Sequence, residues 1–546
     1  MQTKQSIFHG TIILALSAII SKIIGAFYKI PLTNILGASG VGIYYMVFPF
    51  YSASIVLCSS GIGIATSKLI AKHKHNTNLV QMYLKASLLV AFILSLSISI
   101  LTILLSKQIA YLHGDMTISY AFVIIAPAIL ITSILCVFKG FFQGFQNMVP
   151  TSISMIIEQI TKLIFGYLFA FVFLKYGINY SVFGALLGIT ISELITLIIM
   201  IIIYNKNSRN HFQLSIIKSK QKLCALHTKN NYFLHDKNQA TFKDVLLSVT
   251  KLSVPYTITS IIIPIMALID SFLVPKFLQL SGIEGGVSIT LYGLQNGVVN
   301  TLISLPVIVT MSLATVAMPS VSELTNDSLK FTISNRVTKF LKSSYILSLF
   351  LSVIIFVLAP HMIKFLYGSG LKVSSIDEFN FATQMLRLSC ITIVYTAIMQ
   401  TSISILQAIS DNNYPIFIMF FAFIVRIIAM YFLITKTQLN IYGAIIADIL
   451  FLSIIDVLFI ARFNNKNLLN SSIFSDFISP TISAIMCTCV GMVLTSYLSN
   501  LFSVIFIMAI TIFTISFSYM LLLVIFKTIK LNNIKNVLRL TSKSKV

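Results

Sequence analysis

Charged residues are scarce in this sequence. Asp, Glu, Lys and Arg together make up 10% of the 546 residues, against about 25% in a typical soluble domain. Apolar residues make up 57% and the mean hydropathy is +0.94. So little charge cannot cover a water-facing surface of this size, which excludes a soluble globular protein. The apolar runs are continuous and do not alternate with polar residues, which favours transmembrane helices over a β-barrel.

Cysteines are also few, and their spacing follows no pattern. The six are Cys58, Cys136, Cys224, Cys390, Cys487 and Cys489, and most of them lie inside apolar runs. This spacing predicts no disulfide framework, and Cys487 with Cys489 alone gives too few ligands for a metal site. We expect these cysteines to act as small apolar residues. No cluster typical of a metal centre or a catalytic nucleophile occurs, so we expect no cofactor, no metal and no catalytic residue.

Long apolar stretches recur along the chain, each long enough to cross a hydrocarbon core, which takes about 20 residues. We place helices near residues 9–31, 41–68, 84–106, 117–138, 149–174, 180–204, 245–275, 287–317, 343–363, 379–406, 415–435, 440–461, 476–499 and 501–526. The first stretch contains Lys22 and Lys29 and lacks a small-residue cleavage signature. We therefore expect a retained helix there, not a signal peptide. The sequence predicts an all-α polytopic membrane protein of about fourteen transmembrane helices.

The formal net charge of +23 is unevenly distributed along the chain. With the N-terminus inside the cell, most of the 38 Lys and Arg residues fall in inner segments, and the outer loops hold only Lys107, Lys175, Lys276, Lys364, Lys372 and Lys436. This asymmetry follows the positive-inside rule and predicts cytoplasmic N- and C-termini in a bacterial cytoplasmic membrane. The basic excess thus predicts membrane topology and contact with anionic lipids, with no role in binding nucleic acid.

Two halves of the chain resemble each other. Residues 143–150 (Gln-Gly-Phe-Gln-Asn-Met-Val-Pro) and 407–415 (Gln-Ala-Ile-Ser-Asp-Asn-Asn-Tyr-Pro) both lie between the fourth and fifth helix of a six-helix set. Six-helix units repeating in one orientation predict two pseudo-symmetric lobes with a substrate path between them, an architecture of transporters. The predicted parts are a first lobe at 1–204, a basic cytoplasmic linker at 205–244, a second lobe at 245–463, two extra helices at 464–527 and a basic cytoplasmic tail at 528–546.

Several short motifs resemble one known family. They are Ser21-Lys22-Ile23-Ile24-Gly25 with Lys29, residues 142–148 with Pro150 and Glu158-Gln159, Leu305-Pro306, residues 311–314, residues 319–323 and Tyr367-Gly368. In order and spacing they resemble the stage V sporulation protein B and MurJ-like polysaccharide flippases of the multidrug/oligosaccharidyl-lipid/polysaccharide (MOP) superfamily. The resemblance covers nearly the whole chain. It implies a two-lobed transporter that moves an undecaprenyl-diphosphate-linked oligosaccharide or muropeptide from the inner to the outer leaflet by alternating access.

The first helix contains two lysines, Lys22 and Lys29, two helical turns or about 10 Å apart on one stripe. Small residues share this stripe, among them Gly25. A cation at a helix centre costs about 2.5–3.5 kcal/mol, so two on one face require a reason. A cavity that holds a diphosphate would supply one, and the resemblance implies cations facing a central cavity here. Alternatively, Lys29 extends to the outer interface and Lys22 pairs with an acid on another helix.

Other polar residues are candidates for the same cavity. Glu158 and Lys162 lie at i and i+4, so they either form an internal ion pair or leave Glu158 facing substrate. The eighth helix carries a polar stripe of Gln295, Asn296 and Asn300, and the tenth carries Arg387, which either replaces part of the cavity charge or pairs between lobes. The resemblance implies arginines in the second and eighth helices, and this chain has neither.

Three acids are candidates for binding a coupling ion, Na⁺ or H⁺. Asp270 lies on a helix with three prolines, which predict bending and free carbonyl groups; it either binds a cation or pairs with Lys276. Asp448 and Asp456 either pair with Arg426 or provide a second coupling site.

Three kinds of function remain open. The leading prediction is a monomeric, non-enzymatic flippase for a lipid-linked saccharide such as a peptidoglycan precursor or a polysaccharide repeat. A cation-coupled exporter of small molecules would favour an acid-dominated site, whereas the central candidates here are lysines. A membrane glycosyltransferase or polymerase usually has large outer loops, and those predicted here are short.

Overall fold

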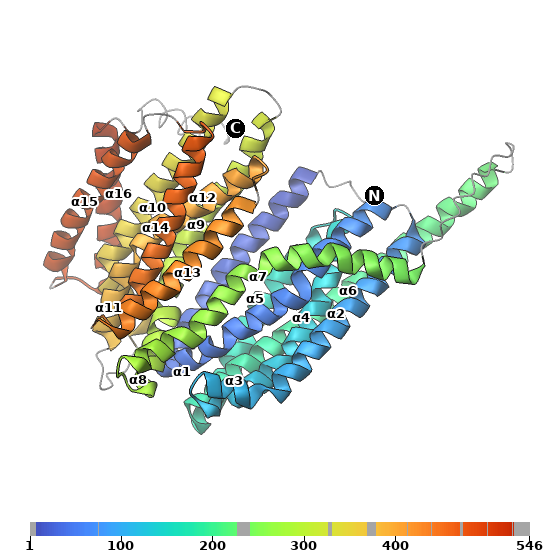
Figure 1. Ribbon diagram of the computed structural model, residues 1–546, viewed down its shortest axis with the longest axis horizontal. Helices are drawn as coiled ribbons and strands as arrows, with labels where there is room; N and C mark the ends of the chain where they lie inside the picture. The colour runs from blue at the N-terminus through green and yellow to red at the C-terminus, as the bar shows by residue number, and fades with distance from the viewer. Residues whose placement is uncertain are drawn as a thin grey trace. The chain divides into compact units, whose positions relative to one another are not determined.

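The computed structural model describes residues 7–74, 76–226, 241–325, 330–368, 378–411, 413–437, 439–469, 473–499, 501–526 and 528. Every regular element within these ranges is a helix (Figure 1). Thirteen of these helices are long and apolar enough to cross a membrane. The predicted all-α class is confirmed, because only helices satisfy the backbone of such continuous apolar segments within one segment.

The first of these long helices contains a sharp break. Helix α1 (Ile7–His73) includes an apolar stretch of 58 residues, Leu16–His73, which as one straight helix would be nearly three times as long as a hydrocarbon core of about 30 Å is thick. Gly37, at φ 66° and ψ 177°, is not helical and divides α1 in two. Glycine adopts this φ without steric cost. With α1 counted as two spans, the described residues contain the fourteen spans that the sequence predicts.

The chain divides into two compact units. The first comprises residues Met1–Leu36 and Ile43–Leu273, and the second comprises Gly37–Gly42 and Val274–Val546. In the first unit α4 packs on α2 and α6, and α5 packs on α6. Its elements besides α1 are α2 (Thr77–Leu104), α3 (Ser106–Leu112), η1 (Met116–Ile118), α4 (Ser119–Gly144), α5 (Val149–Phe173), η2 (Leu174–Tyr176), α6 (Ile178–Leu226) and most of α7 (Phe242–Leu280).

The second unit contains the remaining helices. Helix α12 packs on α9, α10 and α14, α13 packs on α14, and the C-terminal helices α15 and α16 pack on α10 and on each other. The elements are α8 (Gly285–Gly293), the π-helical turn η3 (Leu294–Val299), α9 (Asn300–Thr325), α10 (Lys330–Tyr367), α11 (Glu378–Ser389), α12 (Ile391–Ala408), α13 (Asn413–Thr435), α14 (Ile441–Asn465), α15 (Ile473–Leu498) and α16 (Val504–Ile525).

The segment predicted as a linker is partly helical. Helix α6 continues through the membrane span and ends at Leu226, so residues 205–226 extend it. This segment is polar but contains neither Gly nor Pro, and nothing in it breaks a helix. Residues 227–240 lie outside the described ranges.

The two similar loop motifs have the same backbone geometry. Gln146 and Ser410, the second residues after α4 and α12, have positive φ angles of 59° and 61°. The next residue in each loop, Asn147 or Asp411, donates its N–H to the carbonyl five residues earlier, at 3.0 and 2.9 Å. This is the left-handed helix end with a six-to-one hydrogen bond. The helices α4 and α12 thus end in the same way.

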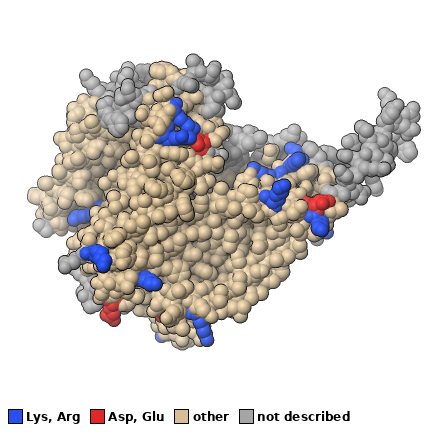
Figure 2. Space-filling view, viewed as in Figure 1, with Lys and Arg blue, Asp and Glu red and all other residues tan. Residues whose placement is uncertain are grey.

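Charge on the visible surface lies at its margins. Figure 2 shows a broad uncharged area over the helices, with Lys and Arg gathered near helix ends. Large apolar side chains face outward along the helices, for example Phe171, Val493 and Phe513, which are 61%, 70% and 71% exposed. Water would oppose such exposure, but lipid does not, so these surfaces fit a bilayer.

Candidate functional site

The first unit contains a group of charged side chains within the membrane-spanning helices. Lys139 on α4 forms an ion pair with Glu158 on α5, with 3.1 Å between Nζ and Oε2. Lys162 lies one turn further along α5, and Glu193 on α6 acts electrostatically on Lys139 and Lys162. Charged groups inside a bilayer are costly and rare, so a group of four makes this region the candidate functional site.

Aromatic rings of α1 border these charges. Lys162 lies over Phe48 and Tyr28, with Nζ 5.0 and 5.9 Å from the ring centres, and Lys29 lies 5.5 Å from the centre of Tyr45. A ring face attracts an ammonium group, and this attraction grows when water is excluded. The rings therefore hold both ammonium groups without neutralising them. We call the five charged residues Lys29, Lys139, Glu158, Lys162 and Glu193 the charged cluster.

Tyr51 links α1 to the deepest acid of the charged cluster. Glu193 is 5% exposed, and its Oε1 accepts a hydrogen bond of 3.3 Å from the Tyr51 hydroxyl. The other carboxylate oxygen, Oε2, has no hydrogen-bond partner within the described residues. In contrast, Lys139 and Glu158 keep side-chain exposures of 18% and 21%. The charged cluster is therefore open at one end and closed at Glu193.

The charged cluster contains part of what the sequence predicted. Lys29 and Glu158 belong to it, and Gly25 lies beside it, where a Cβ would be 3.1 Å from Oε1 of Gln159. Of the two alternatives for Glu158, the ion pair with Lys162 is not formed, because Glu158 pairs with Lys139 of the neighbouring helix; that Glu158 faces substrate stays a prediction. Lys22 lies on the same helix as Lys29, with an exposed side chain.

Sequence reasoning missed Glu193 altogether and treated Lys139 as a residue of an inner loop. The signal for Glu193 was present, since it is the only acid in the predicted span 180–204. A lone acid in an apolar helix indicates a partner on another helix. Its neighbours lie 142 positions earlier in the chain, at Tyr51, and 54 and 31 positions earlier, at Lys139 and Lys162.

The predicted polar stripe in the second unit divides into two parts. Gln295 lies in the π-helical turn η3 and is 5% exposed, and its Oε1 has no partner within the described residues. Asn296 donates to the Tyr292 carbonyl at 3.1 Å, and Asn300 donates to Oδ1 of Asn296 at 3.1 Å. The amides of Asn296 and Asn300 thus bond each other, whereas Gln295 is buried beside them.

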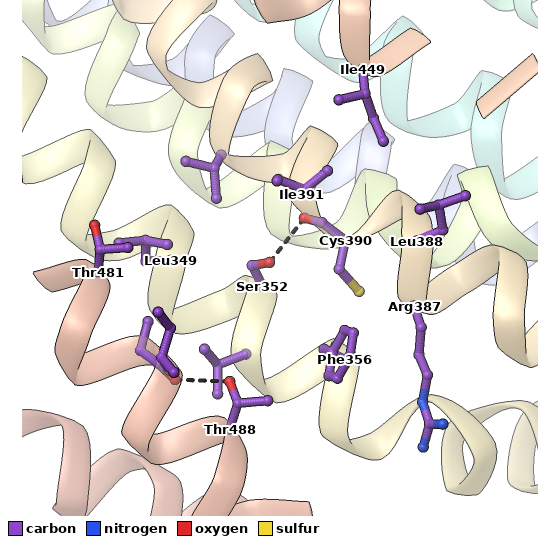
Figure 3. Close-up of a pocket in the computed structure, with 14 residues that line it drawn as sticks. Leu349, Ser352, Phe356, Arg387, Leu388, Cys390, Ile391, Ile449, Thr481 and Thr488 are labelled. Carbon is purple, nitrogen blue, oxygen red and sulfur yellow. Dashed lines mark hydrogen bonds between the residues drawn. The ribbon is translucent and has the colours of Figure 1, made fainter. Parts of the chain in front are cut away.

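Arg387 lines an apolar cavity of about 580 Å³ in the second unit (Figure 3). Its guanidinium lies 5.7 Å from the centre of the Phe356 ring, and its Nε has no hydrogen-bond partner within the described residues. The cavity wall is otherwise mostly aliphatic and comes from α10, α11, α12, α14 and α15. Such a lining suits hydrocarbon, with one cation for an acidic group.

The three candidate coupling acids differ in their surroundings. Asp448 forms an ion pair with Arg426, as one of the predicted alternatives has it, so its charge is already neutralised. Asp456 is 3% exposed, and neither of its carboxyl oxygens has a hydrogen-bond partner within the described part of the chain. Asp270 is half-buried on α7. Asp456 is therefore a buried acid whose carboxyl group lacks hydrogen bonds within the described residues, which is costly in an apolar interior.

A further ion-pair group holds the loop after α12. Asp411 accepts hydrogen bonds from Lys466 at 2.7 Å and from Arg462 at 3.0 Å. Burial opposes ionisation of Asp411, but the two cations outweigh it and keep the pKa of this carboxyl below its usual range. Asp411 follows α12, and Arg462 and Lys466 lie at the end of α14, so these ion pairs tie the loop after α12 to the end of α14.

Comparison with known proteins gives a consistent result. Residues 7–325, more than half of the chain, match the family described as "Polysaccharide biosynthesis protein". Stage V sporulation protein B of Bacillus subtilis (strain 168) is 24% identical over 378 residues, which cover 67% of this chain and 68% of the relative. Lipid II flippase MurJ of the same organism is 27% identical over 161 residues, covering 28% of this chain and 30% of the relative.

Several solved structures have a similar fold. Lipid II flippase MurJ in an inward closed conformation matches with a TM-score of 0.66 at 17% identity, covering 94% of this chain and 98% of that one. An inward-facing multidrug resistance MATE family transporter of the MOP superfamily matches with a TM-score of 0.63 at 14% identity, covering 81% and 95%. At these identities the likeness concerns the fold.

Proposed function

This chain belongs to the polysaccharide biosynthesis protein family, and we propose that it is a transporter that moves an undecaprenyl-diphosphate-linked saccharide from the inner to the outer leaflet of the bacterial cytoplasmic membrane. It does so by alternating access, and its cargo is a peptidoglycan precursor such as lipid II or a polysaccharide repeat. The names of the relatives, a sporulation protein and a lipid II flippase, support this class of cargo.

The charged cluster is the observation that carries the proposal. Lys29 and Lys162 lie over aromatic rings, and neither forms an ion pair within the described residues. A diphosphate needs such cations, and each ammonium contributes a charge-assisted hydrogen bond to a phosphate oxygen. The lysines outnumber the two glutamates, which favours an anionic cargo over the cationic cargo expected of an acid-dominated exporter site.

Translocation in proteoliposomes tests the proposal directly. A fluorescent undecaprenyl-diphosphate saccharide is placed in both leaflets, and a membrane-impermeant quencher reports the fraction accessible from outside. We expect the purified protein to accelerate exchange for a muropeptide or a polysaccharide headgroup, and to leave a phosphatidylcholine probe unaffected. Equal acceleration of all probes, or of none, contradicts the proposed function.

The proposed orientation places both termini in the cytoplasm. Lys175 lies in η2, immediately before the span of α6, and Lys206 lies at the other end of that span. Both are exposed, and we expect Lys175 outside and Lys206 inside. In a cysteine-free background, Lys175→Cys should react with an impermeant maleimide on intact cells, and Lys206→Cys should react only after permeabilisation. The opposite labelling pattern would invert the proposed topology.

Asp456 is the proposed site of ion coupling, and a proton fits it better than Na⁺. Sodium needs several oxygen ligands, whereas an unpartnered buried carboxyl binds a proton without further groups. We expect Asp456→Asn to transport at a rate that no longer responds to an imposed pH gradient. Asp115→Asn is the control, since Asp115 lies in a loop, where its side chain accepts hydrogen bonds from Thr117. A gradient response in Asp456→Asn equal to that of the unmodified protein would remove Asp456 from this role.

A further inference from the structure

The apolar cavity of the second unit has room for a hydrocarbon chain. Its volume is about 580 Å³. An engineered apolar cavity of about 150 Å³ holds one benzene molecule, so this one has room for roughly 20 carbon atoms, the size of one phospholipid acyl chain. Two of its lining residues, Ile391 on α12 and Ile485 on α15, are 45% and 60% exposed. The cavity therefore opens at the protein surface, where a chain can enter from the bilayer.

The hydroxyl groups that line the cavity are already bonded to the protein. Ser352 donates to the backbone carbonyl of Cys390 at 2.9 Å. Thr481 and Thr488 each donate to the carbonyl four residues earlier on α15, at 2.6 and 2.8 Å. No acidic residue lines the cavity within the described part of the chain. Arg387 thus supplies the unmet hydrogen-bond donor of this wall, because its Nε has no partner within the described residues.

Arg387 gives the cavity one cationic end. In Figure 3 its side chain lies at one edge of the group, beside Phe356, whose ring centre is 5.7 Å from the guanidinium. The charges of Arg387 and of Lys364 both act on His361 of α10, and Nδ1 of His361 also has no hydrogen-bond partner within the described residues. This end of the cavity therefore attracts an anion and offers it hydrogen-bond donors.

The cavity runs from this cationic end toward the middle of the membrane. Its lining residues on α10 extend from Phe356 back to Leu349, about 10 Å along the helix axis. Helix α10 ends at Tyr367, and with both termini in the cytoplasm this end lies at the outer surface. A phospholipid of the outer leaflet would thus place its phosphate near Arg387 and one acyl chain along α10. The long side chain of arginine extends toward the interface in such positions.

We propose that this cavity binds one anionic phospholipid of the outer leaflet, with its phosphate at Arg387 and one acyl chain between α10, α12 and α15. The ligand is a glycerophospholipid with one net negative charge, such as phosphatidylglycerol. One planar guanidinium matches one phosphate, because it donates two parallel hydrogen bonds to the phosphate oxygens. The undecaprenyl chain of the proposed cargo is much longer than the cavity. The site is therefore separate from the charged cluster, and the inference does not depend on the cargo.

Native mass spectrometry of the full chain, purified in detergent, counts bound lipids and gives their dissociation constants. We expect one phosphatidylglycerol to bind at least about tenfold more tightly than phosphatidylcholine, because the guanidinium adds a charge-assisted contact that the choline group opposes. Arg387→Met should remove this preference. Lys175→Met is the matched control and should keep it, since Lys175 also lies over a ring, that of Tyr176, but in the first unit.

A second variant tests the cavity and leaves the charge in place. Thr488→Phe puts a ring into the space that the acyl chain would occupy, and the loss of several buried methylene groups should weaken phosphatidylglycerol binding at least about tenfold. Either variant decides the question by itself if the other does not fold. An unchanged preference in Arg387→Met or unchanged binding in Thr488→Phe overturns the inference. Tighter binding of undecaprenyl phosphate than of phosphatidylglycerol by the unmodified protein overturns it as well.

Discussion

Lys29→Met combined with Lys162→Met should abolish transport of a lipid-linked saccharide while the protein remains folded. Each ammonium lies over an aromatic ring without an ion-pair partner within the described residues. A hydrogen bond to a charged group contributes about 1.5–3 kcal/mol. Loss of two such contacts should therefore weaken diphosphate binding by a factor of at least about 100. Translocation in proteoliposomes and complementation of a flippase-deficient strain measure the effect.

Methionine is the substitution of choice because it separates charge from packing. It retains a flexible apolar chain against the rings and removes only the ammonium group. Lys175→Met is the matched control, since Lys175 also lies over a ring, 4.8 Å from the centre of Tyr176, but in an exposed turn. The control should transport normally. Normal growth and transport with the double variant would refute a role for the charged cluster in binding cargo.

Gly140→Val should prevent the first unit from folding. Gly140 on α4 faces Gly63 on α1 so closely that a Cβ at residue 140 would lie 2.4 Å from the Gly63 carbonyl oxygen. The obstacle is backbone, which cannot rotate away as a side chain can. Small residues at such crossings let transmembrane helices approach, and here the approach positions α4, with Lys139 next to Gly140, against α1. We expect loss of monodisperse protein in detergent.

A graded series measures the cost of this contact. Gly140→Ala adds only the Cβ and should lower stability by about 1–3 kcal/mol, the usual range for overpacking, seen as a lower midpoint of thermal unfolding. Gly286→Ala is the control, because a Cβ there meets nothing within 4 Å, and it should be neutral or slightly stabilising. A midpoint unchanged by Gly140→Ala would mean that the helices separate at no cost.

The helices followed from sequence because their cause is local. Each apolar run must satisfy its own backbone in lipid, so length and hydropathy alone predicted nearly every span. The break in α1 could also be predicted from the sequence, because an apolar stretch long enough for two spans must be interrupted. The extension of α6 to Leu226 was not predicted, since polar composition was taken as evidence against helix although no residue there breaks one.

Only part of the candidate site could be predicted from the sequence. A cation or acid inside a span can be recognised from the sequence, as Lys29, Glu158 and Lys162 were. The partner of such a residue does not, because it lies on another helix far along the chain. Spacing within α5 suggested that Glu158 pairs with Lys162, yet Lys139 of α4 is the partner, at 3.1 Å. Among the coupling acids, Asp448 and Asp456 lie on the same helix, but only Asp448 is paired with Arg426.

The sequence by itself therefore determined that this protein lies in a membrane, where its helices run, and that charged residues occur inside the spans. Each of these depends on composition within about twenty residues. Only the tertiary structure decided which charges cancel and which remain. That outcome depends on packing between α1, α4, α5 and α6, and on glycines such as Gly140 that bring the backbones together. Electrostatic energy depends on distances between helices, and a linear sequence does not contain these distances.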